Sequence, residues 1–139
     1  MSADRAFVDT NVLVYAVDTG EPAKRGIART VLAERADLLV LSAQVLAELY
    51  VVTTRKLAVP LSEDDGAGYV EELSGLPIVA IDAELVLDGI RISRQAQLSF
   101  WDGLIVAAAR AGGCGVLLTE DLAAGSTIAG VAVENPFVE

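Results

Sequence analysis

The sequence predicts an α/β fold, a three-layer α/β/α sandwich with a central parallel sheet. Short apolar runs with the length of buried strands alternate along the chain with longer segments of helical periodicity. A parallel sheet is buried on both faces, so helices are expected on both sides of it. The chain has 139 residues and is 53% hydrophobic, which is enough for one core. We therefore expect a single domain over residues 1–139.

The expected strands are apolar runs that are too short for helices and too apolar for surface loops. There are five such runs: AFV (6–8), LLVL (38–41), PIVAI (77–81), GVLLT (115–119) and VAV (131–133).

Local start signals place helices between these runs. An apolar helical run, VLVYAV, follows Asp9, and proline at a first turn opens a helix at 22–36. Polar caps then predict helices at 43–57, 63–74, 83–96 and 100–111. The capping residues are Ser42, Ser62, Asp82 and Ser99, and Gly112 with Gly113 closes the last helix.

The composition excludes several classes of enzyme. The chain has no histidine and one cysteine, which rules out Ser-His-Asp and Cys-His catalysis and His-ligated zinc. Hydrolytic chemistry would depend on carboxylates, which prefer hard cations such as Mg²⁺ or Mn²⁺. A lone cysteine and the lack of a secretory or membrane-spanning segment lead us to expect a cytoplasmic protein. The net charge of −10 argues against non-specific nucleic-acid binding, although bound cations would reverse the sign locally.

Two acids directly follow expected strands. Asp9 comes after AFV, and Asp121 lies just beyond GVLLT. In doubly wound sheets, ligands bind beyond the carboxyl ends of strands, so these positions indicate a site. The alternatives remain open that Asp9 caps the next helix and that Asp121 belongs to a polar turn. Glu120 is left out of the site, because adjacent side chains point apart.

Two further acids lie in helices. Glu48 falls at the border of the apolar arc of its helix, where it could reach a cleft or remain an ordinary flanking carboxylate. Asp102 fits the S-x-x-D form of a capping box with Ser99, yet it points between Ile105, Val106 and Ala109. Either the helix start is open to water, or a cation meets this carboxylate.

The ordered set FVDTNVLVYA, SAQVLAELY, SFWDGLIVAAA, LLTEDL and VENPF resembles PIN-domain ribonucleases, and more narrowly the VapC toxins of toxin–antitoxin pairs. The likeness runs from Phe7 to Phe137. It implies a metal-dependent endoribonuclease whose bound Mg²⁺ or Mn²⁺ activates water against the phosphodiesters of tRNA, rRNA or mRNA. It also implies a cognate antitoxin and a homodimer. The acids that it implies as catalytic metal ligands are Asp9, Glu48, Asp102 and Asp121, with Asn11 and Thr119 helping to organise the site.

Two other readings stay open: a non-catalytic interaction module with the same fold, and another acid-cluster phosphoester hydrolase. A phosphatase-like D-x-D motif is disfavoured because Asn11 stands where its second acid belongs. A receiver domain requires a late lysine, and no lysine follows Lys56. For an RNA enzyme, we expect the basic residues Lys24, Arg25, Arg55 and Lys56 to include those that position phosphate.

Overall fold

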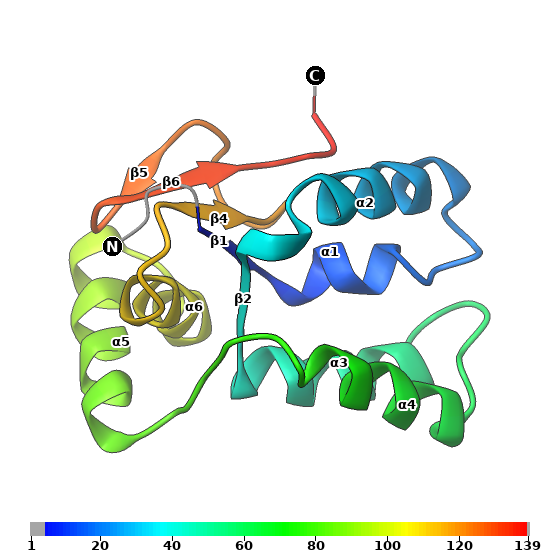
Figure 1. Ribbon diagram of the computed structural model, residues 1–139. Helices are drawn as coiled ribbons and strands as arrows, with labels where there is room; N and C mark the ends of the chain where they lie inside the picture. Colours follow the sequence, from blue (N-terminus) through cyan, green and yellow to red (C-terminus); the bar gives the residue numbers. More distant parts are fainter. Residues whose placement is uncertain (1–4, 139) are drawn as a thin grey trace.

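The computed structural model describes residues 5–138 and confirms the α/β class (Figure 1). Strands and helices follow one another in the expected alternation. In chain order the elements are β1 (Ala6–Val8), α1 (Thr10–Tyr15), α2 (Pro22–Glu34), the 3₁₀ turn η1 (Ala36–Leu38), β2 (Leu39–Ser42), α3 (Ala43–Arg55), α4 (Glu63–Leu73), β3 (Ile78–Val79), α5 (Ala83–Ala96), α6 (Phe100–Ala111), β4 (Val116–Leu118), β5 (Thr127–Ile128) and β6 (Val131–Glu134).

The six strands form one sheet in the order β3–β2–β1–β4–β6–β5. β1 is central, because Phe7 pairs in parallel register with Val40 of β2 and with Leu117 of β4. The five expected strands all pair in parallel, and β5, a strand that the sequence did not predict, adds one antiparallel pairing with β6 at the edge. Between these strands the backbone takes positive φ at Ala129 (50°) and Gly130 (85°), and this tight turn sends the chain back as a hairpin.

The polar caps expected for the helices are all present. The Ser42 hydroxyl accepts a hydrogen bond from Val45 N–H, and Ser62 accepts one from Asp65 N–H. Asp82 and Ser99 cap α5 and α6 in the same way. These caps fix where each helix leaves the preceding strand or loop, and so they fix the positions of the side chains in its first turn.

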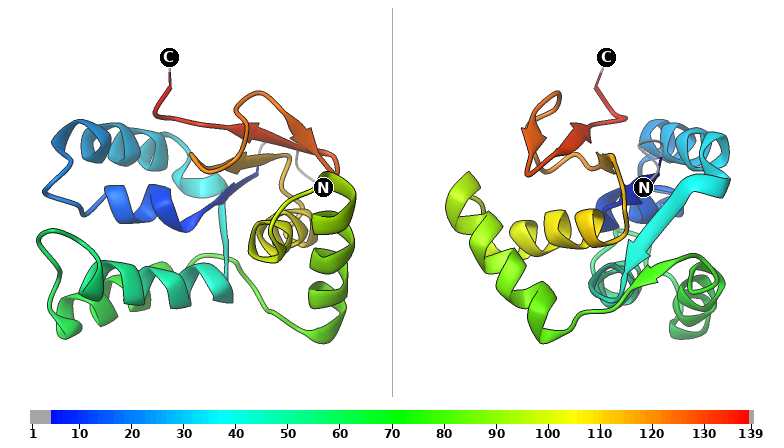
Figure 2. Two further views of the ribbon diagram at one scale, coloured as in Figure 1. Left: turned by 180° about the vertical axis from the view of Figure 1, so that it is seen from behind. Right: turned by 60° about the vertical axis from the view of Figure 1, so that its left-hand side comes forward.

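The helices form two groups, α1–α4 on one side of the molecule and α5 with α6 on the other (Figures 1 and 2). α5 and α6 approach very closely at two glycines. A Cβ atom at Gly103 would lie 2.5 Å from the carbonyl oxygen of Gly89. The start of α6, which carries Asp102, is therefore fixed by backbone contact with α5.

The core is continuous between the sheet and both groups of helices. Its fully buried side chains include Phe7, Leu41, Leu49, Leu104 and Leu117. None of the described helices combines the length and the apolar character that spanning a bilayer requires.

Candidate functional site

Asp9 lies at the carboxyl end of β1, beside the end of β4. Its backbone N–H donates to the carbonyl of Leu118 (3.0 Å), which keeps the two strand ends together. The side chain is only 6% exposed. Oδ1 accepts from Thr10 N–H at 2.8 Å, as the N-cap of α1, and Oδ2 accepts from the Thr119 hydroxyl at 2.9 Å. Asp9 is thus both a helix cap and a buried carboxylate at the strand end, so its two expected roles are compatible.

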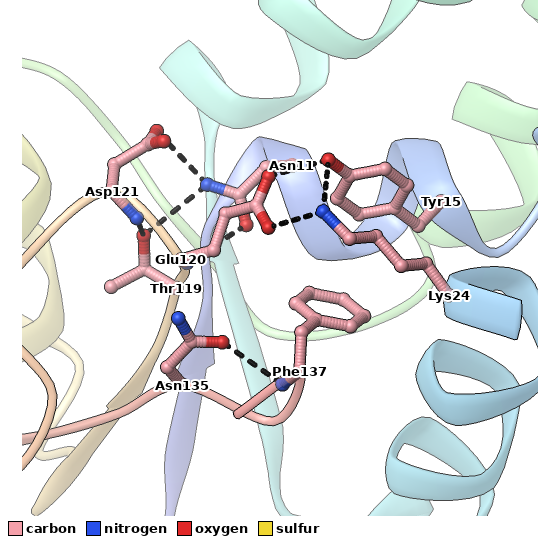
Figure 3. A network of polar contacts seen from close by, with 8 residues as sticks. All are labelled: Asn11, Tyr15, Lys24, Thr119, Glu120, Asp121, Asn135 and Phe137. Carbon is pink, nitrogen blue, oxygen red and sulfur yellow. Dashed lines mark hydrogen bonds and ion pairs between the residues drawn. The ribbon is translucent and has the colours of Figure 1, made fainter. Parts of the chain in front are cut away.

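Asn11 links the two strand ends through one side-chain amide (Figure 3). Its Nδ2 lies 3.0 Å from Asp121 Oδ2, 3.2 Å from Thr119 Oγ1 and 3.4 Å from Asp9 Oδ2. Its Oδ1 accepts from the backbone N–H of Glu120 at 3.3 Å. The structure therefore brings together four of the six residues that the sequence singled out.

Glu48 approaches this group from α3. The Thr10 hydroxyl donates to Glu48 Oε1 at 3.5 Å, which is a long contact. The side chain is exposed, so its expected border position lies nearer to solvent than the helical wheel indicated. Glu48 and Asp121 both line a hollow of about 390 Å³, together with Thr10, Asn11 and Tyr15. Asp18 and Glu21 line the same hollow, and the sequence did not single them out.

Asp102 lies apart from that hollow, half-buried in the first turn of α6. Its backbone N–H donates to the Ser99 hydroxyl at 3.1 Å, which confirms the cap. Its charge acts on Glu48, whose pKa is raised first by desolvation and further by Asp102 and Asp121. Across residues 5–138, no three acidic, cysteine or histidine side chains already stand at the spacing of metal ligands.

Burial raises the pKa of Asp9 to about 6, against opposition from the hydrogen bonds of Thr119 and Thr10. The neighbouring charges of Asp121 and Glu48 raise it further. A carboxylate that is desolvated and faces other carboxylates takes up a proton more readily unless a cation compensates it. The site is therefore anionic at neutral pH and has an electrostatic reason to bind a cation.

A second polar group adjoins the site and was missed in the sequence. Tyr15, one helical turn beyond Asn11, donates its hydroxyl hydrogen bond to Glu120, and Lys24 contacts both (Figure 3). The i,i+4 spacing of Asn11 and Tyr15 places both on one face of α1 and is the signal that could have revealed it. Glu120 indeed points away from Asp121. Lys24 is paired with Glu120, which argues against the expected phosphate contact at that residue.

A sequence profile of the PIN domain matches residues 6–125. No curated protein matches the chain significantly. Among solved structures, FitAB bound to the IR36 DNA fragment is similar, with 23% identity, a TM-score of 0.72 and 96% of each chain covered. A toxin–antitoxin complex from Klebsiella pneumoniae is 20% identical, with a TM-score of 0.71 and coverage of 95% of this chain and 98% of that one.

A third similar structure is VapC20 from Mycobacterium tuberculosis, a toxin described as cleaving the sarcin–ricin loop. It is 19% identical, with a TM-score of 0.65 and coverage of 81% of this chain and 86% of that one. At these identities the likeness concerns the fold, and it agrees with the sheet and helix arrangement described above. The profile match covers most of the sequence, and the chain therefore belongs to the PIN domain family.

Proposed function

We propose that this chain is a metal-dependent endoribonuclease and the toxin of a cytoplasmic toxin–antitoxin pair. The observation that carries the proposal is the shared hydrogen bonding of Asp9, Asn11 and Asp121 at neighbouring strand ends, with Glu48 across the hollow. The proposed catalytic residues and metal ligands are Asp9, Glu48, Asp102 and Asp121, and Asn11 and Thr119 organise them.

The donor set fits Mg²⁺ or Mn²⁺. It consists of carboxylates, whose oxygens are the hard ligands that these cations prefer. Ligation requires the carboxylates to draw closer, since three of them do not yet share one point within the described chain. Glu48 is exposed and can rotate toward the site, whereas buried Asp9 is fixed by its two hydrogen bonds and Asp121 is held by the Asn11 amide. The other carboxylates would therefore have to move toward Asp9 for a metal to bind.

Bound Mg²⁺ would supply a water of lowered pKa and neutralise charge on the scissile phosphate. The chain's own residues hold the site ready. Thr119 and Thr10 N–H keep the Asp9 carboxylate in one orientation and favour its ionised form. The Asn11 amide contacts both carboxylates and so holds Asp121 toward Asp9.

The substrate we propose is single-stranded or loop RNA, because exposed bases are what proteins read in RNA. The similar VapC20 is described as cleaving a loop, and two other similar structures are described as toxin–antitoxin or DNA-bound assemblies, which supports a cognate antitoxin. We also propose a homodimer. Of the basic residues expected to position phosphate, Lys24 is paired with Glu120 at 3.0 Å and Arg55 lies 4.0 Å from Glu63, so we propose exposed Lys56 as the first to test.

The test is RNA cleavage by purified protein with Mg²⁺ or Mn²⁺, with and without EDTA. We expect cleavage that EDTA abolishes and that Asp9→Asn removes. The matched control is Asp82→Asn, which changes another capping aspartate at the exposed start of α5 and should cleave as the wild type does. Cleavage that survives both EDTA and Asp9→Asn would refute the proposal. Failure to cleave any RNA with metal present would favour the non-catalytic module.

A further inference from the structure

Lys24, Tyr15 and Glu120 form a compact polar network beside Asn11 and Asp121 of the candidate metal site (Figure 3). Lys24 Nζ lies 3.0 Å from Glu120 Oε2 and 3.2 Å from the Tyr15 hydroxyl oxygen. The three residues come from α2, α1 and the turn after β4, respectively. The network therefore ties together three segments that are far apart in the sequence.

The turn at residues 119–121 is held from two sides. On the site side, Asn11 Oδ1 accepts from Glu120 N–H, and the Thr119 hydroxyl accepts from Asp121 N–H at 3.0 Å. On the opposite side, the Glu120 side chain is held by Lys24 and Tyr15. Because neighbouring side chains in the turn point apart, fixing Glu120 outward also fixes the direction of Asp121 toward Asn11.

The segment after β6 covers this network. The ring of Phe137 packs edge-on against Tyr15, with centroids 4.9 Å apart, and the Lys24 ammonium lies 5.7 Å from the Phe137 centroid. Asn135 Oδ1 accepts from Phe137 N–H at 2.9 Å and shapes the turn that presents the ring. The Lys24 and Glu120 side chains remain 37% and 23% exposed, so the aromatic ring adds contact with the ammonium without removing the pair from water.

We propose that Lys24, with Glu120 and Tyr15, is a positioning residue that orients Asp121 for metal binding, and that Phe137 closes the arrangement. The inference rests on the proposed metal site. Lys24 itself does not touch the metal or the RNA in this assignment. It acts through the Glu120 side chain on the backbone that carries Asp121.

The direction in which Mn²⁺ affinity changes on replacing Lys24 distinguishes a positioning role from a purely electrostatic one. Lys24→Met removes a positive charge near the site, which by Coulomb's law alone would leave cation affinity unchanged or make it tighter. Loss of positioning has the opposite effect, since residues that orient metal ligands cost about 10–100-fold in affinity when they are replaced. We expect Lys24→Met to bind Mn²⁺ about tenfold more weakly, and Lys24→Arg to retain most of the affinity.

The experiment is isothermal titration of the full chain with MnCl₂, accompanied by thermal unfolding of each variant. Tyr15→Phe is the second test variant, because it removes only a hydroxyl and changes no charge. Arg35→Met is the matched control. It breaks an ion pair at the other end of α2, where Arg35 lies 2.8 Å from the Glu134 side chain, and it removes none of the side-chain contacts of residues 119–121. We expect both test variants to bind more weakly and the control to bind as the wild type does.

The possible outcomes are distinct. Wild-type affinity in Lys24→Met or Tyr15→Phe, tighter binding in Lys24→Met, or a lower melting temperature with unchanged affinity would each overturn the positioning role. If Arg35→Met weakened Mn²⁺ binding as much as Lys24→Met, the positioning role would also be overturned, because losing any ion pair of α2 would then have the same effect. A wild-type protein that binds no Mn²⁺ would instead refute the proposed metal site itself.

Discussion

Asp9→Asn tests the electrostatics of the site through the stability of the metal-free protein. The pKa of Asp9 rises from 3.8 to about 6, chiefly through burial, and the side chain is 6% exposed. A pKa shift of that size means that the folded protein disfavours the ionised form of Asp9 by about 3 kcal/mol. Asparagine keeps the cap of α1, because its Oδ1 can accept from Thr10 N–H as the carboxylate does.

The direction in which stability changes with pH follows from proton binding to Asp9. Between about pH 4 and pH 6 the folded protein holds a proton on Asp9 that the unfolded chain has already released. The free energy of unfolding therefore falls as pH rises through this window, and above it the folded state carries the full penalty. Glu48, whose pKa is also raised, adds to the same trend. At pH 7 the uncharged Asp9→Asn protein should be more stable than the wild type by up to about 3 kcal/mol.

The assay is urea unfolding in EDTA, followed by circular dichroism at pH 4.5, 5.5 and 7. Wild type should lose stability across this series, Asp9→Asn should lose much less, and Asp82→Asn should follow the wild type. Parallel pH profiles for wild type and Asp9→Asn, or a large loss of stability in Asp9→Asn at pH 7, would refute the reasoning.

Three further predictions concern metal binding and packing. Added Mg²⁺ should raise the melting temperature of the wild type but not of Asp9→Asn, by mass action; an equal shift in both would contradict Asp9 as a ligand. Gly103→Ala should destabilise by about 1–3 kcal/mol in urea, because its Cβ would meet the backbone of α5, whereas Gly68→Ala has open space and should not. Ser42→Ala should cost about 1 kcal/mol through loss of the α3 cap, and an unchanged urea midpoint would argue against that cap.

Local chemistry explains which parts of the fold could be predicted. A capping hydroxyl and its N–H partner lie three residues apart, so Ser62 and Ser99 reveal helix starts without any tertiary information. The strand Thr127–Ile128 carries no such signal. It depends on pairing with β6 across a turn at Ala129. The positive φ of Ala129 could not be predicted from the sequence, because alanine rarely adopts it.

The candidate site divides in the same way. Asp9 and Asp121 could be found because each follows an apolar strand, and their contacts with Asn11 confirm that they lie together. Their roles in metal binding stay predictions. Asp102 is absent from the lining of the hollow because its position is set by the packing of α6 against α5, and the outward direction of Glu120 depends on Lys24, some hundred residues away. A helical wheel describes one helix at a time, so it could predict neither of these tertiary arrangements.

The central position of β1 has a consequence for how the protein is synthesised. During synthesis, Asp9 emerges long before its partners Thr119 and Asp121, which lie 110 or more residues later, and the ring of Phe137 follows them. A translation product that stops before β4 lacks Thr119 and Asp121, which are two of the four residues that share hydrogen bonds at the strand ends. The site therefore cannot be complete before Asp121 has been translated.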